Sequence, residues 1–326
     1  MTGPWQSEGE WLKTALHLHS IESDGTASPT DLVGAYSLAG FDVVAITEHW
    51  KVTKEPSTAS TLVIQGAELA VDPMAEGRYS EILAIGIEEI PEDPGGDKRF
   101  WEPIDNYLFK TFPDYTTAAA CINDQGGVAF MCHPYWSGHT PDILYAAEGL
   151  AGIELFNAGA ERDNGRGDSS YLWDLALERG MPLSGIATDD THYPEVDIGA
   201  GWTMVRAAER TQAAVVEALR SGEFYASAGP SLLHVERDGG HVEVSCSPCF
   251  SVQVHTNWER GWYVRADDRN QQSAIEGEAE LGSRALETTE DGSITRAEFD
   301  MSDPGITYYR IVLTDAAGQK AWSNLI

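Results

Sequence analysis

The pattern of apolar and polar residues divides the chain near residue 230. Between about residues 14 and 222, short apolar runs rich in β-branched residues alternate with helical stretches, as in parallel strands joined by crossover helices. The runs that predict strands are ALHLH, FDVVAIT, TLVIQGAE, EILAIGI, GVAFMCH, GIELFN and PLSGIAT. Beyond residue 230, alternating runs separated by Asp-Gly, Gly-Gly and Ala-Gly turns predict antiparallel strands.

This change of pattern predicts two domains. We expect residues 1–228 to form a β/α barrel or a large wound sheet, and residues 229–326 to form a small β-sandwich of immunoglobulin size. Within the first domain, SPTDLVGAYSLAG predicts a helix that Ser28 caps and Gly40 ends. A glycine pair ends TTAAACINDQGG in the same way, and this order of helix, glycine and strand is typical of a β/α barrel.

The charge balance limits the expected partners. The chain has 21 basic and 52 acidic residues, a net charge of −31, which repels a nucleic-acid backbone and makes long nucleic acid an unlikely partner. A small phosphorylated substrate stays compatible, because bound divalent cations can dominate the potential of a pocket. No apolar run approaches the ~18 residues of a membrane span, so we expect a cytoplasmic protein without a membrane partner. The oligomeric state is left open.

A pair of histidines carries the strongest chemical signal. His17 and His19 are two residues apart on a predicted strand, so their imidazoles point to one face, while Leu16 and Leu18 point to the other. Hydrogen-bonded core histidines are the alternative interpretation. Asp24, in the SDG turn that follows, adds a third possible metal ligand.

Further acidic and imidazole side chains follow the other predicted strands. They are Glu48, His49, Glu68, His133, Glu154, Asp189, Asp190 and His192. Barrel enzymes place their reactive residues at these carboxyl ends of strands, whereas solvated charges scatter over both ends. Imidazole and carboxylate groups suit Zn, Mn or Fe, so the pattern predicts a metal-dependent hydrolase.

In this order, HLHSIESDG, ITEH, GAE, CHP and TDDTH resemble the motifs of the PHP (polymerase and histidinol phosphatase) superfamily, over about residues 14–228. The resemblance implies a distorted, TIM-like barrel of seven strands, two or three divalent ions (Zn, Mn or Fe) and phosphoesterase activity. GEFYASAGP and AWSNLI resemble a subgroup that carries a trailing β domain.

The resemblance also implies ligands. His17, His19 and Asp190 would hold one ion, Glu68 would bridge to a second ion, and His49 with Asp24 would complete that second site. His133 and His192 would complete the cluster or hold a third ion. The chain departs from the pattern at Glu81, where many members have His, and we expect its carboxylate to face the cavity rather than the solvent.

The expected activity is hydrolysis of a small phosphate ester (sugar, nucleotide or cyclic phosphate) by a metal-bound hydroxide. Asp190 would orient the nucleophile, and His192, if it is not a ligand, would protonate the leaving oxygen. Two alternatives stay open. One is an amidohydrolase-type enzyme that acts on an amide or lactone; the SDG and TEH segments and Glu68 argue against it. The other is a non-catalytic, metal-stabilised binding protein.

Several side chains have two interpretations. Tyr135, Trp136 and Trp173 either line the pocket or pack in the core, and Arg162 and Arg166 either bind a phosphate or face solvent. Glu154 is either a hydrogen-bond partner of a ligating imidazole or a strand-end charge. We expect no ligands from His234, His241 and His255, and ordinary thiols at Cys246 and Cys249. Loops such as residues 87–113 would set the pocket size.

Overall fold

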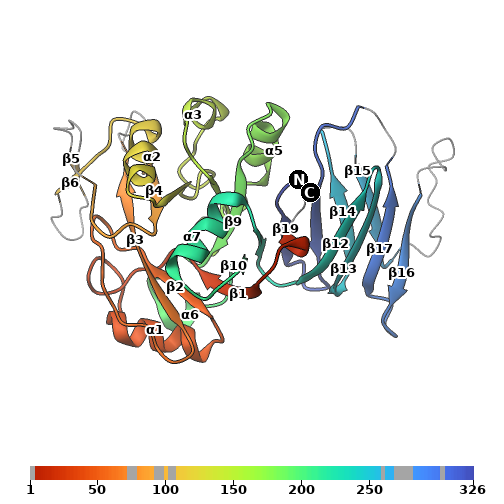
Figure 1. The fold of residues 1–326 in the computed structure, drawn as a ribbon, viewed down its shortest axis with the longest axis horizontal. Helices are drawn as coiled ribbons and strands as arrows, with labels where there is room; N and C mark the ends of the chain where they lie inside the picture. Colours follow the sequence, from red (N-terminus) through yellow and green to blue (C-terminus); the bar gives the residue numbers. More distant parts are fainter. Residues whose placement is uncertain are drawn as a thin grey trace. The chain divides into compact units, whose positions relative to one another are not determined.

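The computed structural model describes residues 4–71, 79–91, 99–101, 108–257, 261–267, 282–301 and 305–326; part of the loop at residues 87–113 thus lies outside the described residues. The chain forms two compact units. One comprises Glu8–Glu223 and is called the α/β unit; the other comprises Met1–Ser7 with Phe224–Ile326 and is called the β unit (Figure 1). The division falls between Glu223 and Phe224, because strand β11 (Phe224–Ser227) pairs with the β unit's β19 (Lys320–Ser323).

The α/β unit is built on one mixed sheet. In order across the sheet its strands are β10 (Trp202–Ala207), β1 (Glu10–Ala15), β2 (Val43–Ile46), β3 (Leu62–Ala70), β4 (Glu81–Ile85), β7 (Val128–Met131), β8 (Gly152–Asn157) and β9 (Ser184–Thr188). Its helices are α1 (Pro29–Leu38), α2 (Tyr115–Asp124), α3 (Pro141–Ala146), α4 (Ala158–Asn164), α5 (Ser170–Glu178), α6 (Pro194–Asp197) and α7 (Gln212–Ser221). The short strands β5 (Arg99–Trp101) and β6 (Leu108–Lys110) pair with each other.

Six of the seven predicted strands lie where expected, whereas the first, ALHLH, shares only Ala15 with β1; the directions also differ from the prediction at β4. This strand runs antiparallel to both β3 and β7, so the expectation of uniformly parallel strands is wrong there. The reversal places Glu81, the first residue of β4, beside Ala70 at the carboxyl end of β3. Strand β10 was not predicted and pairs antiparallel with β1.

The two ends of this sheet approach each other at β9 and β10. No backbone ladder joins these two strands in the part of the chain that the structure describes, and a side chain connects them instead. The Thr203 hydroxyl donates to the Ala187 carbonyl at 3.0 Å and accepts from the Ala187 N–H at 3.2 Å. The fold is therefore a mixed α/β sheet with a second β unit, and the closed seven-stranded barrel is not confirmed.

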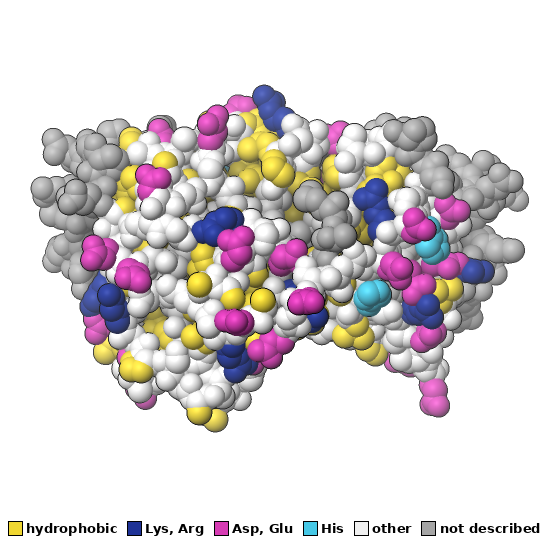
Figure 2. All heavy atoms as spheres, viewed as in Figure 1, with side chains coloured by type: hydrophobic (Ala, Val, Ile, Leu, Met, Phe, Trp, Pro, Cys, Tyr) yellow, Lys and Arg dark blue, Asp and Glu magenta, His cyan; other side chains and the backbone are white. Residues whose placement is uncertain are grey.

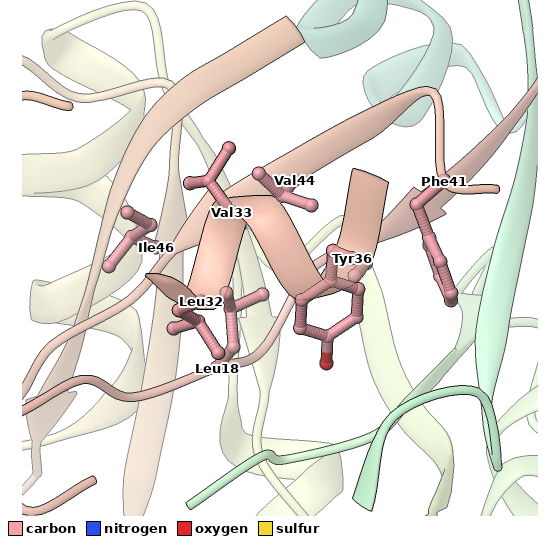
Figure 3. Packing of buried hydrophobic residues seen from close by; sticks show 8 residues of the cluster. Leu18, Leu32, Val33, Tyr36, Phe41, Val44 and Ile46 are labelled. Carbon is pink, nitrogen blue, oxygen red and sulfur yellow. The ribbon is translucent and has the colours of Figure 1, made fainter. Parts of the chain in front are cut away.

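Helix α1 shows how the sequence fixes the position of a site segment. Ser28 caps the helix by accepting from the Asp31 N–H at 3.1 Å. Figure 3 shows the buried face of α1 packed against β2, with the side chains Leu32, Val33, Tyr36, Val44 and Ile46 in one cluster. Each such side chain contributes roughly 1.5–3 kcal/mol when fully buried. The Tyr36 hydroxyl also donates to Asp189 at 2.9 Å, which ties α1 to the segment after β9.

The β unit contains two antiparallel sheets, as the alternating pattern predicts. One has the order β15 (Gly261–Arg265), β14 (Ser251–His255), β18 (Arg310–Thr314), β19 and β11. The other has the order β12 (Leu232–Asp238), β13 (His241–Cys249), β17 (Ile294–Asp300) and β16 (Ser283–Thr288), and a 3-10 helix (Pro4–Gln6) precedes the α/β unit. Among the described residues of either unit, no helix has the length and apolarity that a membrane crossing requires.

Candidate metal centre

The His17 and His19 side chains lie beyond the strand that was predicted to carry them. Strand β1 ends at Ala15, and the chain continues in extended form, held where the Leu18 N–H donates to the Thr47 hydroxyl at 3.0 Å. The alternation survives this change: Leu18 packs in the core below α1, while both imidazoles meet carboxylates on the opposite face. The predicted common face of the two histidines is therefore present.

A first donor set consists of His17, His19, Glu68 and Asp190. The Nε2 atoms of both histidines lie 3.1 and 3.2 Å from Glu68 Oε2, and 3.3 and 3.5 Å from Asp190 Oδ1. Donors sharing a tetrahedral ion at about 2.1 Å would be separated by about 3.4 Å. Both Nε2 atoms and Asp190 Oδ1 are buried without a hydrogen-bond partner, and such orphaned polar atoms are costly unless a ligand satisfies them. This donor set fits a divalent cation.

A second donor set shares Glu68 with the first and adds His49, His133 and Glu81. His49 Nδ1 lies 3.3 Å from Glu68 Oε2 and 3.7 Å from Glu81 Oε1. His133 Nε2 lies 3.4 Å from Glu68 Oε1 and 3.5 Å from Glu81 Oε2. Glu68 thus presents one oxygen to the first set and both to the second, which is the arrangement of a bridging carboxylate.

A third donor set joins Asp24, His49 and His192. Asp24 Oδ2 lies 3.2 Å from His192 Nε2 and 3.4 Å from His49 Nε2. The resemblance pairs Asp24 with His49 at the second ion; the structure has this pair and brings His192 to the same carboxylate. Because a neutral imidazole ligates through one nitrogen, His49 can serve either the second or the third set, but not both.

Glu81 faces the cavity, where the sequence left two orientations open. Its side chain is buried, and burial together with nearby Glu68 raises its pKa to about 7. The antiparallel direction of β4 explains this position, because the start of that strand meets the carboxyl ends of β3 and β7. A cation held between Glu81 and the two imidazoles would keep the carboxylate ionised.

The imidazoles of the cluster carry protons when no cation is present. Burial alone would lower the pKa of His19, His49, His133 and His192, but the surrounding carboxylates outweigh it and raise each pKa to about 9. Burial would raise the pKa of Asp190, but the imidazoles of His17, His19 and His192 outweigh it and hold that pKa well below its usual range. Metal ions would therefore replace protons at this centre.

Glu154 forms hydrogen bonds to residues of the donor sets and is not itself a member of the three sets. It accepts from His17 Nδ1, from the His133 N–H and from the Thr188 hydroxyl, each at 2.7 Å. These bonds fix the His17 ring with Nε2 directed at Glu68. Of the two interpretations of Glu154, the geometry favours the hydrogen-bond partner.

Two supporting residues escaped the sequence analysis. Asn157 donates to Asp190 Oδ2 at 3.1 Å, which leaves Asp190 Oδ1 for the first donor set. Its place at the end of GIELFN, beside Glu154, was the signal that could have identified it. Cys132 is buried among Glu68, His133 and His17, and burial raises the pKa of its thiol well above the ordinary value.

Asp189 holds a loop rather than an ion. Its buried carboxylate accepts backbone N–H groups from Gly199 at 2.9 Å and from Ala200 and Gly201 at 2.8 Å. The next residue, Asp190, has a φ of 52°, and His133 has a φ of 24°. Non-glycine residues in this left-handed region cost of order 1–3 kcal/mol each, and such strain is typical of functional sites.

The aromatic candidates and Arg166 differ in how deeply they are buried and in what they contact. Trp173 is fully buried and donates to the Leu183 carbonyl at 2.8 Å, so it packs in the core. Trp136 meets the His133 ring edge-to-face at 4.9 Å between centroids. Tyr135 is 46% exposed, and the Arg166 guanidinium lies 6.0 Å from its ring centroid.

Arg162 supports the site from outside. It forms an ion pair with Asp197, whose carboxylate also accepts the His192 N–H at 2.8 Å and the Tyr193 N–H at 2.7 Å. Its guanidinium is therefore engaged in holding the loop that carries His192, rather than free to bind a phosphate.

The β unit contributes no residue to any donor set found among the described residues. His234, His241 and His255 all lie outside these sets. Cys246 and Cys249 are buried thiols of strand β13.

No protein-family model and no curated protein matches the chain. Among solved structures, a two-domain protein from Bacteroides vulgatus containing a predicted PHP-like metal-dependent phosphoesterase matches with 19% identity and a TM-score of 0.48, over 100% of this chain and 98% of its own. An amidohydrolase from Chromobacterium violaceum, with bound sulfate and no metal, matches with 17% identity and a TM-score of 0.38, over 56% and 89%. A complex of endonuclease Q with a 27-mer duplex matches with 11% identity and a TM-score of 0.45, over 66% and 56%.

Sequence identity is low in all three matches. At such identities and TM-scores, they assign neither an activity nor a substrate to this chain.

One prediction from composition needs correction. The exclusion of long nucleic acid, and with it the restriction to a small phosphorylated substrate, is wrong, because the endonuclease Q neighbour is bound to a DNA duplex with an abasic lesion at its active site. Net charge describes a whole surface, whereas bound ions and local side chains set the potential of a site. On the face shown in Figure 2, basic side chains lie among the acidic ones, so the surface is not a uniform acidic field.

Proposed function

We propose that the chain is a metal-dependent phosphoesterase whose centre is formed by the three donor sets. The observation that carries the proposal is the convergence of buried, unpartnered donor atoms from His17, His19 and Asp190 around the shared carboxylate of Glu68. Without a cation, these buried atoms make no hydrogen bond and meet only as ion pairs, so the group suits two or three ions of Zn, Mn or Fe.

Bound divalent ions would supply a nucleophilic water at neutral pH and stabilise the charge on the phosphoryl group. The protein would orient that water through Asp190 Oδ1, whose position is fixed by the bond from Asn157 to Oδ2. His192 lies at the accessible edge of the centre, with 29% of its side chain exposed. The Asp24 and Asp190 carboxylates outweigh burial and raise the pKa of His192 to about 9, so it would donate a proton to the leaving oxygen if it holds no ion.

Arg166 is the residue proposed to contact the substrate outside the ions. Its guanidinium forms no ion pair with a described carboxylate and lies over the half-exposed Tyr135 ring, two residues after His133. The Gly167 carbonyl next to it accepts the Asn157 N–H at 3.1 Å, which keeps Arg166 close to the Asp190 side of the centre. A guanidinium so placed can bind a phosphate oxygen of the substrate.

The test is phosphate release by protein loaded with Mn, Zn or Fe, before and after chelation. The substrate panel covers sugar phosphates, nucleotides, cyclic phosphates and a DNA duplex with an abasic lesion. We expect release that depends on the ions. A metal-replete protein that is inert on the whole panel would contradict the proposal and favour a metal-stabilised binding protein. Opening of lactones or amides in place of phosphate release would favour an amidohydrolase-type enzyme.

A further inference from the structure

Glu48 is a fully buried carboxylate that belongs to none of the donor sets, although it directly precedes His49. Its carboxylate accepts hydrogen bonds from the turn that carries Asp24. The Ser20 N–H lies 3.2 Å from both carboxylate oxygens, and the hydroxyl groups of Ser20 and Ser23 both donate to the same carboxylate. Glu48 therefore fastens this turn to the end of β2.

Ser23 connects that carboxylate to two residues of the donor sets. Its Oγ lies 3.3 Å from His19 Nδ1 and 3.2 Å from Asp24 Oδ1. When Ser23 donates to Glu48, its oxygen can accept the Nδ1–H of His19. In the neutral imidazole that an ion would bind, Nε2 then has no proton and is directed at Glu68 as a ligand.

The turn has little freedom to adopt another arrangement. Gly25 packs against the backbone of His19, where an added Cβ would lie 2.2 Å from the His19 carbonyl oxygen. The N–H of Gly25 also donates to the Ser20 carbonyl at 2.9 Å. A change in how Glu48 holds Ser20 and Ser23 would therefore reach His19 and Asp24 directly.

We propose that Glu48 is a positioning residue of the metal centre: through Ser23 it selects the tautomer of His19, and through Ser20 and Ser23 it holds the turn that presents Asp24. Glu154 performs the first of these tasks for His17 by direct contact at 2.7 Å. Glu48 selects the tautomer of His19 through the Ser23 hydroxyl, and it also holds the turn that presents Asp24. The inference rests on the proposed metal centre, but it requires no assumption about the substrate.

The test compares Glu48→Gln with Glu22→Gln, both in the full chain. Glu22 lies in the same turn, is exposed, and pairs with Lys51 instead of with the donor sets, so its change is a matched control. Mn affinity is measured by competition with a chelator, and ion content by elemental analysis. We expect Glu48→Gln to weaken the most loosely held ion about 10- to 100-fold, as loss of an outer partner of a metal ligand does, and Glu22→Gln to leave every affinity unchanged.

A second variant separates positioning from general damage to the fold. Ser23→Ala breaks the link to His19 but keeps the bonds between Ser20 and Glu48, so we expect a smaller loss of affinity in the same direction. If Glu48→Gln does not fold, Ser23→Ala alone provides the test. Excess Mn should restore the rate of either variant.

Unchanged Mn affinities in a folded Glu48→Gln protein, or an equal loss at every ion, would overturn the inference. If only Ser23→Ala folds, an unchanged Mn affinity in that variant would also overturn the inference. Wild-type protein that binds no ion would instead contradict the proposed function, so the two failures can be told apart.

Discussion

A buried histidine of the α/β unit and a half-buried histidine of the β unit have opposite properties, which their neighbours give them. In the α/β unit, carboxylates surround His19 and raise its pKa to about 9 against the effect of burial. In the β unit, burial and the nearby Arg310 lower the pKa of His255 to about 4, and Arg310 Nη2 donates to His255 Nδ1 at 3.1 Å. A histidine among carboxylates attracts a cation, whereas one held by a guanidinium stays neutral and repels it.

Because of this difference, a histidine with carboxylates near it in the sequence indicates a candidate metal ligand, whereas a histidine without them does not. His234, His241 and His255 lie on strand-like runs without accompanying carboxylate motifs, and the donor sets among the described residues contain none of them. The predictions below disturb the two environments in turn.

The largest effect is expected for Asp190→Asn, which removes a ligand charge without changing the side-chain volume. We expect kcat to fall by about 100-fold or more, because the variant loses both a donor of the first set and the group that orients the nucleophile. Asp163→Asn, at an exposed position of α4, is the control and should keep its rate. Near-wild-type turnover of Asp190→Asn, measured with saturating Mn, would remove Asp190 from the centre.

A smaller effect is expected at Glu81, whose substitution tests the composition of the second donor set. Glu81→His exchanges an oxygen donor for a nitrogen donor between His49 and His133, so activity should persist while the preferred ion shifts from Mn towards Zn. Glu81→Ala should weaken the ion of this set. Rates of both variants are compared across Mn, Zn and Fe, and a metal preference that neither substitution changes would place Glu81 outside the ligands.

Arg166→Ala tests a cation at the rim of the centre. We expect KM to rise several-fold with little change in kcat, because the contact would hold the substrate equally in the ground state and the transition state. Arg179→Ala is the matched control, since Arg179 also lies over a tyrosine ring, that of Tyr145 at 4.5 Å, but near the start of β9. Equal kinetics for the two variants would leave Arg166 without a role in substrate binding.

The smallest effect concerns the β unit alone. Because the pKa of His255 is lowered to about 4 from its unfolded value near 6.5, its contribution to stability is present above pH 6.5 and is lost as the pH falls towards 4. His255→Gln should remove this dependence, which amounts to roughly 1–3 kcal/mol. Urea unfolding of wild type and variant at pH 7 and pH 4.5 measures it, and a stability difference that does not change with pH would refute the assignment.

The sequence predicted the elements well, because periodicity and capping act locally. Ser28 caps α1 as expected, and the acidic and imidazole residues after β2, β3, β7 and β9 converge because carboxyl ends of strands meet at one edge. The direction of β4 depends on pairing between distant strands, and no local pattern encodes it. For this reason the orientation of Glu81 could not be settled from the sequence.

Contacts between loops were equally inaccessible from the sequence. Arg162 finds Asp197, and Asn157 finds Asp190, only because α4 and the loop after β9 pack together in space. The same holds for the bonds from Ser20 and Ser23 to Glu48, whose partners are separated by more than one element of the chain. The link between β9 and β10 through the Thr203 side chain is likewise a contact between segments that no local pattern encodes.

The central claim, that the three donor sets hold divalent ions, is tested most directly by anomalous diffraction from crystals of protein expressed and purified with Mn or Zn. We expect at least two anomalous peaks, one between His17, His19 and Asp190 and one between His49, His133 and Glu81, with Glu68 in contact with both. Metal-supplemented protein whose crystals show no peak at these residues, or peaks only elsewhere on the chain, would contradict it.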